Sequence, residues 1–344
     1  MNILILAVQV PYVRGGAEIL TQSLKDKIQE AGHRVDIVTL PFRWIPKTEL
    51  VKNCLAWKLM KLDEINGEKI DRVIATKFPS YFAEHPGKVT WLVHQFREIY
   101  DLYNTRYTAF HNELEDNQVR EAVIKWDSEA LKDSRRVYTI SKNVSNRLLK
   151  FNGRRSTPLY PPPHMGDRYR TDSYGDFVLC VGRLEGNKRP ELIIKAMQLI
   201  PDRYTCVMVG TGSMRKALDE MCEKEGVTSR VRFAGEVDDR TLLDLYAQCG
   251  CVFYGPIDED YGYVTVEAMK SRKPVVTCRD SGGTLEFVTD GETGMVTATR
   301  PEEIAAAVTK VLEDRDLARR LGETGADRVA CIGWDRVIES LVGR

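Results

Sequence analysis

The sequence has no long hydrophobic run, no low-complexity tract and no net charge. No stretch reaches the roughly 18 to 20 consecutive apolar residues that a membrane-spanning helix needs, so we expect any membrane contact to be peripheral. The 50 Lys and Arg residues equal the 50 Asp and Glu residues in number, which argues against general nucleic-acid binding. Hydrophobic residues make up 43% of the chain and charged residues 29%, a composition typical of globular domains.

Zinc-binding patterns are also missing. None of the eight cysteines forms a CxxC pair or a cluster with histidine. Most lie in apolar, strand-like runs, so we interpret them as reduced core residues of a cytosolic protein. The apolar start MNILILAVQV lacks a basic leader and a small-residue cleavage site, which predicts a buried first strand rather than a signal peptide.

The length of 344 residues exceeds what one hydrophobic core usually supports, which predicts two domains. Short runs rich in β-branched residues alternate with helical patterns in both halves, and this alternation is typical of parallel sheets covered by helices on both faces. The run Pro161–Pro163 can continue neither a helix nor a central strand, so it marks a linker. We expect α/β domains over 1–163 and 164–333, and a helix over 334–344 that packs back on the first domain.

Two glycine pairs each precede a predicted helix at the end of a strand. Gly15 and Gly16 follow the first strand, and Gly282 and Gly283 follow a strand near residue 277. Glycine lets backbone amides approach a ligand, and a helix N-terminus carries partial positive charge suited to phosphate. The pairs indicate either phosphate contacts or tight connections, and neither pair is part of a GxGxxG dinucleotide fingerprint.

Charged residues follow two strands of the second half. The loop VGRLEGNKRP carries Arg183 and Lys188, five residues apart, and both cations can reach one diphosphate. The segment EDYGYVTVE places Glu259 in a loop and Glu267 about one turn into the next helix, with Gly262 between them. Each carboxylate can accept hydrogen bonds from sugar or ribose hydroxyls. The alternatives without a function are a solvent-exposed basic loop for Arg183 and Lys188, and an acidic cluster that caps a helix for Glu259 and Glu267.

These elements together resemble the retaining glycosyltransferases of family 4, which have the GT-B fold of two Rossmann-like domains. VGRLEGNKRPELIIKA, the two glutamates followed by AM, and the SGG turn with TDGETG stand in the family's order over residues 170–325. The first half matches more loosely, through RGGAE, the strand ending at His94 and VYTISKNVSNRLLKF. The resemblance implies a nucleotide-diphosphate sugar donor bound mainly by the second domain and a glycan, lipid-linked or small-molecule acceptor bound by the first.

The resemblance also implies roles for single residues. Arg183 and Lys188 would bind the donor diphosphate, Glu267 the ribose and Glu259 the transferred sugar. His94 would lie beside that sugar; the alternative is a satisfied structural histidine. The remaining donor contacts would come from the segment after Glu259 and from the glycine pairs, namely Tyr261, Gly262, Tyr263, Val264, Gly15, Gly16, Gly282 and Gly283. Two departures are Tyr261, where the family often has Phe, and Thr284, where Pro is frequent.

The resemblance leaves substrates and partners open. It predicts no metal or other cofactor, a cytoplasmic location and a role in cell-surface polysaccharide synthesis. The segment Lys47–Lys69 reads as one or two lysine-bordered amphipathic helices, which either pack on their own domain or touch an anionic membrane. Alternatives are a nucleotide-sugar epimerase or hydrolase, a dehydrogenase, which the missing GxGxxG disfavours, and a non-catalytic nucleotide-sugar-binding subunit.

Overall fold

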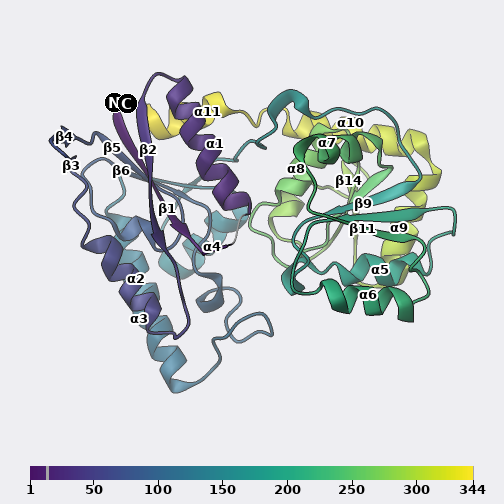
Figure 1. Cartoon of the computed structure of the whole chain (residues 1–344), viewed down its shortest axis with the longest axis horizontal. Coiled ribbons are helices and arrows are strands. Elements are labelled where there is room, and N and C mark those ends of the chain that lie inside the picture. The colour runs from purple at the N-terminus through teal and green to yellow at the C-terminus, as the bar shows by residue number, and fades with distance from the viewer. Residues whose placement is uncertain (13–14, 344) are drawn as a thin grey trace. The chain divides into compact units, whose positions relative to one another are not determined.

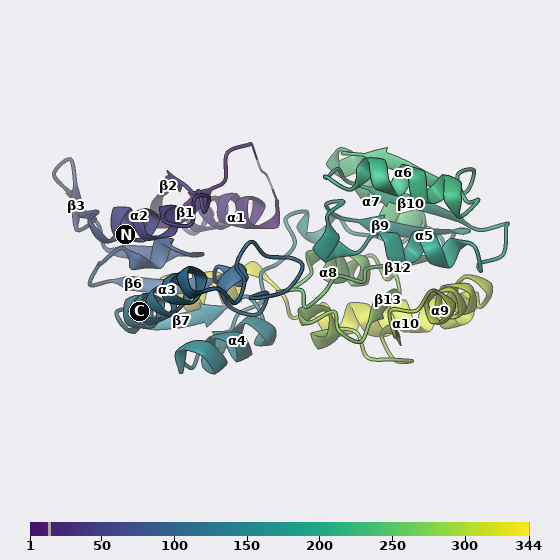
Figure 2. The same cartoon turned by 90° about the horizontal axis from the view of Figure 1, so that it is seen from below.

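The computed structural model describes residues 1–12 and 15–343, and it divides them into two compact units. The first unit comprises residues 1–164 and 332–344, and the second comprises residues 165–331. Each unit is a parallel six-stranded sheet with helices on both faces (Figure 1, Figure 2). The predicted fold class, two doubly wound α/β domains, is confirmed.

The sheet of the first unit has the strand order β2-β1-β5-β6-β7-β8. Its strands are β1 (Asn2–Gln9), β2 (Arg34–Pro41), β5 (Arg72–Ala75), β6 (Lys88–Leu92), β7 (Arg136–Thr139) and β8 (Thr157–Pro158). The helices of this unit are α1 (Gly16–Glu30), α2 (Glu49–Lys58), α3 (Leu114–Lys132), α4 (Lys142–Asn152) and α11 (Trp334–Val342). The order reverses between β1 and β5, and ligands of open α/β sheets bind at such a switch point, outside the carboxyl ends of the strands.

The sheet of the second unit has the order β11-β10-β9-β12-β13-β14. Its strands are β9 (Phe177–Val181), β10 (Thr205–Val209), β11 (Val231–Gly235), β12 (Cys251–Phe253), β13 (Val275–Cys278) and β14 (Gly294–Thr297). Its helices are α5 (Glu191–Met197), α6 (Arg215–Lys224), α7 (Asp239–Gln248), α8 (Tyr263–Lys270), α9 (Pro301–Glu313) and α10 (Arg315–Val329). The switch point here lies between β9 and β12, so the loops after these two strands are the expected ligand-binding loops.

Helix α11 belongs to the first unit although it is the last element of the chain. The Trp334 ring packs edge to face on Trp91 of β6, with ring centroids 6.4 Å apart. Arg72 of β5 donates to the carbonyls of Leu341 and Gly343, at 2.8 and 2.9 Å. An arginine that binds the last carbonyls of a helix also offsets the negative end of its dipole.

The segment Lys47–Lys69 was predicted to form one or two helices. Only α2 is helical there, so a second helix in this segment is wrong. Residues Glu64–Ile65 and Glu68–Lys69 form the antiparallel hairpin β3-β4. Asn66 and Gly67 between them both have positive φ, 52° and 82°, and an Asn-Gly turn of this kind favours a two-residue hairpin over a helix. No helix among residues 1–12 and 15–343 is long and apolar enough to cross a membrane.

Candidate functional site

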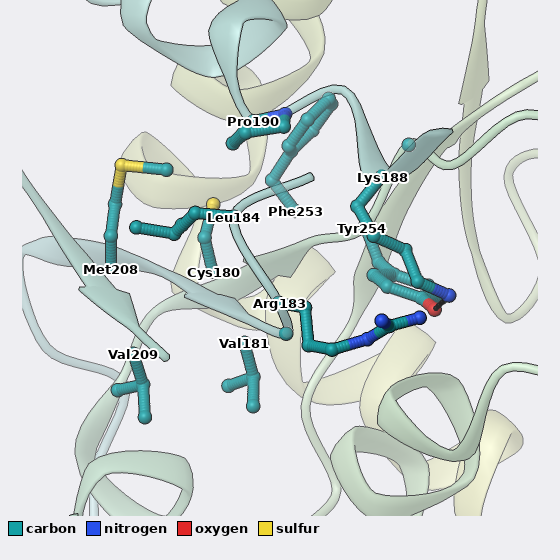
Figure 3. Close-up of a pocket in the computed structure, with 12 residues that line it drawn as sticks. Cys180, Val181, Arg183, Leu184, Lys188, Pro190, Met208, Val209, Phe253 and Tyr254 are labelled. Atoms are coloured by element: carbon teal, nitrogen blue, oxygen red, sulfur yellow. Dashed lines mark hydrogen bonds between the residues drawn. The ribbon is translucent and has the colours of Figure 1, made fainter. Parts of the chain in front are cut away.

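The loop after β9 carries the two cations that the sequence singled out. Lys188 ends a short 3-10 helix, Gly186–Lys188, and Arg183 lies at the start of the loop. Figure 3 shows the side chains of Arg183, Lys188 and Tyr254 meeting at one side of a small pocket. Within the described part of the chain, no hydrogen bond or ion pair joins the exposed Arg183 guanidinium to another protein group. A cation in this state is available to a ligand.

Arg189, the next residue, has a purely structural set of contacts. Its guanidinium is buried and donates to the carbonyls of Gly255 and Pro256, at 2.7 and 2.8 Å. It also holds both oxygens of Asp280, at 2.7 and 2.6 Å, and this bidentate contact lowers the pKa of the Asp280 carboxyl. Arg189 therefore ties the loops after β9, β12 and β13 together.

Glu259, after β12, forms an ion pair with Lys188. The Tyr254 hydroxyl donates to the same Glu259 oxygen, Oε2, at 2.9 Å, and lies 3.4 Å from the Lys188 Nζ. Burial, followed by the charge of Glu259, raises the pKa of Tyr254 well above its usual value, so the phenol stays protonated and donates. Tyr254 thus fixes the positions of both charged partners.

The second glycine pair, Gly282 and Gly283, bonds to the backbone of the loop that carries Glu259. Gly282 and Glu259 form a parallel β-bridge, and the Gly283 amide donates to the Glu259 carbonyl at 2.7 Å. Gly282 has φ of 59°, and a Cβ on Gly283 would lie 2.5 Å from the Asp260 carbonyl oxygen. The two glycines are required for this close approach, and the Gly283 amide already has a protein acceptor.

Glu267 lies one turn into α8 and is buried. The Tyr246 hydroxyl of α7 donates to its Oε2 at 2.8 Å. Burial, and then the Glu267 charge, raises the pKa of Tyr246, so this phenol also stays a donor. Gly262 opens α8 with φ of 83°, and a Cβ there would lie 2.9 Å from the Thr284 Oγ1. The left-handed turn at Gly262 is what lets the chain pass from the Glu259 loop into the helix that carries Glu267.

The residues around this turn form an aromatic group. The Tyr261 ring is buried and packs edge to face on Tyr263 and Phe287, with centroids 5.1 and 5.6 Å away. Val264, in the first turn of α8, is 8% exposed. The packing of Tyr261 shows that this departure from the family's usual Phe keeps the aromatic core contact.

In the first unit, Gly15 and Gly16 stand at the start of α1 as predicted. Arg14, the first residue of RGGAE, and the preceding Val13 lie outside the described residues. The Gly15 amide donates to the Glu18 carboxylate at 2.9 Å. Glu18 also accepts from the Lys77 Nζ at 2.8 Å. The positive end of α1 therefore already has an acidic side chain of the protein as its partner.

His94 follows β6 at its carboxyl end and is half-buried. Its Nδ1 lies 2.8 Å from the Gln95 carbonyl oxygen. A carbonyl oxygen can only accept, so Nδ1 is the donor in this contact.

The structure thus brings Arg183, Lys188 and Glu259 together around Tyr254, with Glu267 close enough to influence the same phenol. Sequence reasoning missed Tyr254 and Tyr246. Both are tyrosines in or next to apolar strands and helices, where an aromatic residue usually indicates core packing, so no sequence signal set them apart. Among residues 1–12 and 15–343, no group of three or more His, Cys, Asp or Glu side chains is placed to hold a metal ion.

Comparison with known proteins identifies a family match for the second unit. Residues 168–328, nearly the whole second unit, match the family described as Glycosyl transferases group 1. Over this segment the chain is similar to the group 1 glycosyltransferases. The match contains Arg183, Lys188, Glu259 and Glu267, so the resemblance read from the sequence motifs is confirmed.

Related sequences and structures extend the comparison. An uncharacterized glycosyltransferase of Methanocaldococcus jannaschii is 36% identical over 169 residues, 48% of this chain and 43% of that protein. A D-inositol 3-phosphate glycosyltransferase of Corynebacterium glutamicum is 30% identical over 167 residues, 46% of this chain and 40% of that protein. These alignments span less than half the length of either relative. The crystal structure of Anabaena HepE in complex with UDP and glucose covers 100% of both chains with a TM-score of 0.74 and 18% identity, which supports the GT-B fold.

Proposed function

We propose that this chain is a retaining glycosyltransferase that moves a sugar from a nucleotide-diphosphate donor, with UDP as the expected nucleotide, to a hydroxyl acceptor. The observation that carries the proposal is the cluster at the switch point of the second sheet. Two cations, Arg183 and Lys188, lie there beside two carboxylates that are held by tyrosines. The family match and the UDP found in the HepE structure give further support.

The cations supply the charge that the reaction needs. As the bond between sugar and phosphate breaks, negative charge grows on the departing diphosphate, and a fixed cation close to it lowers the barrier. In this proposal Arg183 and Lys188 supply the positive charge, and no metal ion is needed. When the diphosphate binds, the Lys188 ammonium contacts the phosphate oxygens in addition to Glu259.

The carboxylates bind the hydroxyl groups of the donor. Glu267 accepts from the ribose hydroxyls in a carboxylate orientation that the Tyr246 hydroxyl fixes. Glu259 accepts from the transferred sugar, with contacts from the segment Tyr261–Val264. The acceptor hydroxyl attacks from the face that the diphosphate leaves, and the diphosphate takes its proton. The residues contribute mainly by positioning and by charge stabilisation.

The first unit has a part in the same proposal. The family resemblance assigns His94 to the transferred sugar and Gly15 and Gly16 to the donor, and the proposal keeps these assignments. We place the reaction in the cytoplasm, in the synthesis of a cell-surface polysaccharide or another glycan, with a glycan, a lipid-linked sugar or a small polyol as acceptor.

One experiment separates transfer from its alternatives. Thermal shift with UDP, GDP and ADP first identifies the nucleotide, because binding to the folded state raises its stability. The matching nucleotide sugars are then incubated with glycan and polyol acceptors, with and without EDTA, and nucleotide release is measured by chromatography. Release that needs an acceptor and continues in EDTA supports the proposal. Release without acceptor indicates a hydrolase, a changed sugar with the nucleotide still attached indicates an epimerase, and binding without turnover indicates a non-catalytic subunit.

A peripheral membrane contact through α2 belongs to the same proposal. The helix buries Leu50, Cys54 and Trp57 in its own unit, whereas Leu55 and Leu59 are 47% and 76% exposed. These two leucines lie among the exposed lysines Lys52, Lys58 and Lys61. We expect co-sedimentation with anionic vesicles to fall steeply with salt, since attraction to a charged surface is screened beyond a Debye length of roughly 10 Å at 0.1 M. Equal recovery with neutral and anionic vesicles would refute an electrostatic contact.

A further inference from the structure

A second pocket lies in the first unit, at the switch point of its sheet. It has a volume of about 330 Å³, within the range of small-molecule sites. Its walls come from the carboxyl ends of β1 and β2, from the first turns of α1 and from Lys77, two residues after β5. This is the position where an open α/β sheet binds its ligand, and none of the residues predicted from the sequence lines it.

The lining combines apolar residues with hydrogen-bonding side chains. Ala7, Val8 and Ile37 come from the strands. Around them are two amides, two hydroxyls and one ion pair, contributed by Gln9, Gln22, Thr21, Thr39, Glu18 and Lys77. Thr39 and Gln22 are exposed on the edge strand β2 and on α1. Apolar residues beside hydrogen-bond donors and acceptors suit a sugar ring, which has a C–H face and several hydroxyls.

The charges in this pocket cancel each other. Lys77 and Glu18 form an ion pair at 2.8 Å, with side chains only 10% and 19% exposed. Glu18 also accepts the Gly15 amide, so the positive end of α1 is neutralised from within the chain. The Ser80 hydroxyl accepts the backbone amide of Lys77 at 3.3 Å, which fixes the start of this turn. An incoming anion would have to compete with Glu18 for Lys77 and leave a half-buried carboxylate without its cation.

We propose that this pocket binds an uncharged, polyhydroxylated group about the size of one sugar ring. The assignment of that group to the acceptor rests on the proposed function; the binding site itself does not. Gln22 and Thr39 hydrogen-bond its hydroxyls, the Lys77–Glu18 pair offers one donor and one acceptor without net charge, and apolar residues of the lining contact its C–H face. The acceptor end recognised here is therefore a neutral sugar or polyol rather than a phosphorylated one.

The test uses sugars of known charge as probes and two matched tryptophan substitutions on α1. Saturation-transfer NMR measures binding of methyl α-D-glucoside, methyl α-D-galactoside, methyl α-D-mannoside and myo-inositol, each beside a phosphorylated counterpart. Gln22→Trp fills the pocket. Gln29→Trp places the same ring on an exposed position of the same helix, seven residues or about 10 Å further along. Thr39→Val removes one hydroxyl at nearly constant volume.

We expect at least one uncharged probe to bind the natural chain and Gln29→Trp, and to bind Gln22→Trp about tenfold or more weakly. Thr39→Val should weaken the same probe by about twofold to tenfold, as expected for one lost hydrogen bond. The proposal is overturned if no uncharged probe binds, if Gln22→Trp binds as the natural chain does, or if the phosphorylated probes bind more tightly. A parallel titration with UDP reports on the second unit alone, so a failure of the proposed donor site is seen separately.

Discussion

Both units place a lysine–glutamate pair at the switch point of a parallel sheet, but the surroundings of the two pairs differ. In the first unit, the charges of Lys77 and Glu18 cancel and the helix N-terminus is occupied by Glu18. In the second, the Lys188–Glu259 pair has Arg183 beside it, and no protein group within the described residues pairs with that arginine. We propose that this additional cation suits the second site to an anion, whereas the first site is neutral.

The comparison separates what the fold does from what the side chains do. The strand order brings the loop ends together in both units. The ligand is then selected by the balance of charge in those loops. If this is correct, substitutions at the second pair should alter donor use strongly, and substitutions at the first pair should leave donor affinity unchanged.

Lys188→Ala should give the largest effect. One unit charge at about 4 Å contributes about 4 kcal/mol at an effective dielectric near 20, so its removal should slow transfer about 10² to 10³-fold. Lys77→Met is the matched control and should leave the KM for the donor unchanged. Steady-state turnover measures both. Near-normal turnover of Lys188→Ala would contradict the electrostatic role assigned to this residue.

Asp127→Asn tests whether a buried acid of the first unit is structural only. Asp127 is completely buried and accepts the Tyr100 hydroxyl at 2.6 Å, and burial raises its pKa from 3.8 to about 7. The folded state then binds more protons than the unfolded state between these values, so stability of the natural chain falls as pH rises toward 7 and levels off above it.

The Asp127→Asn variant has no titrating carboxyl at this position, so its stability does not fall in this way as pH rises. Its free energy of unfolding relative to the natural chain should rise by about 3 kcal/mol between about pH 5 and about pH 8. Urea unfolding at both values measures this, and nucleotide affinity should not change. A difference that is the same at both pH values would show that Asp127 does not titrate in this range.

Glu267→Ala should weaken binding of the nucleoside diphosphate by about 1.5 to 3 kcal/mol, the range for a hydrogen bond to a charged group. Glu292→Ala, at an exposed acid of the same unit with a 63% exposed side chain, is the control for a loss of negative charge. Calorimetry measures both affinities. Equal affinities in the two variants would argue against a ribose contact at Glu267.

Tyr254→Phe should have the smallest effect, because only one hydroxyl is lost. Without it, Glu259 and Lys188 keep their ion pair but lose the hydrogen bond that fixes it, and turnover should fall about fivefold, near 1 kcal/mol. Affinity for the free nucleotide should be nearly unchanged. Tyr246→Phe should behave in the opposite way, lowering nucleotide affinity more than turnover, because its hydroxyl holds Glu267. The same pattern in both variants would contradict separate roles for the two tyrosines.

Much of this architecture could be predicted from local sequence patterns. Runs of β-branched residues predicted the alternation of strands and helices in both halves, and the motifs singled out Arg183, Lys188, Glu259 and Glu267 as candidates. The last strand of each sheet has a weak sequence signal, because β8 is only two residues long and ends in Pro158 and β14 begins with Gly294. The hairpin was not predicted, because the segment was interpreted as helical although Asn66-Gly67 within it is typical of a hairpin turn.

The parts of the site that could not be predicted depend on long-range contacts. Tyr254 and Glu259 are five residues apart, but Lys188 reaches them from 66 and 71 residues away. In the first unit, Lys77 meets Glu18 across 59 residues. Glu18 ends the RGGAE element but Lys77 belongs to no motif, so only the folded chain brings the two together.

Calorimetric titration of UDP into the natural chain in the presence of EDTA tests the central claim most directly. The account predicts binding that persists without metal, that is about 10² to 10³-fold weaker in Lys188→Ala, and that is unchanged in Lys77→Met. Absence of binding in EDTA with recovery on adding manganese, or equal affinities in Lys188→Ala and Lys77→Met, would contradict it.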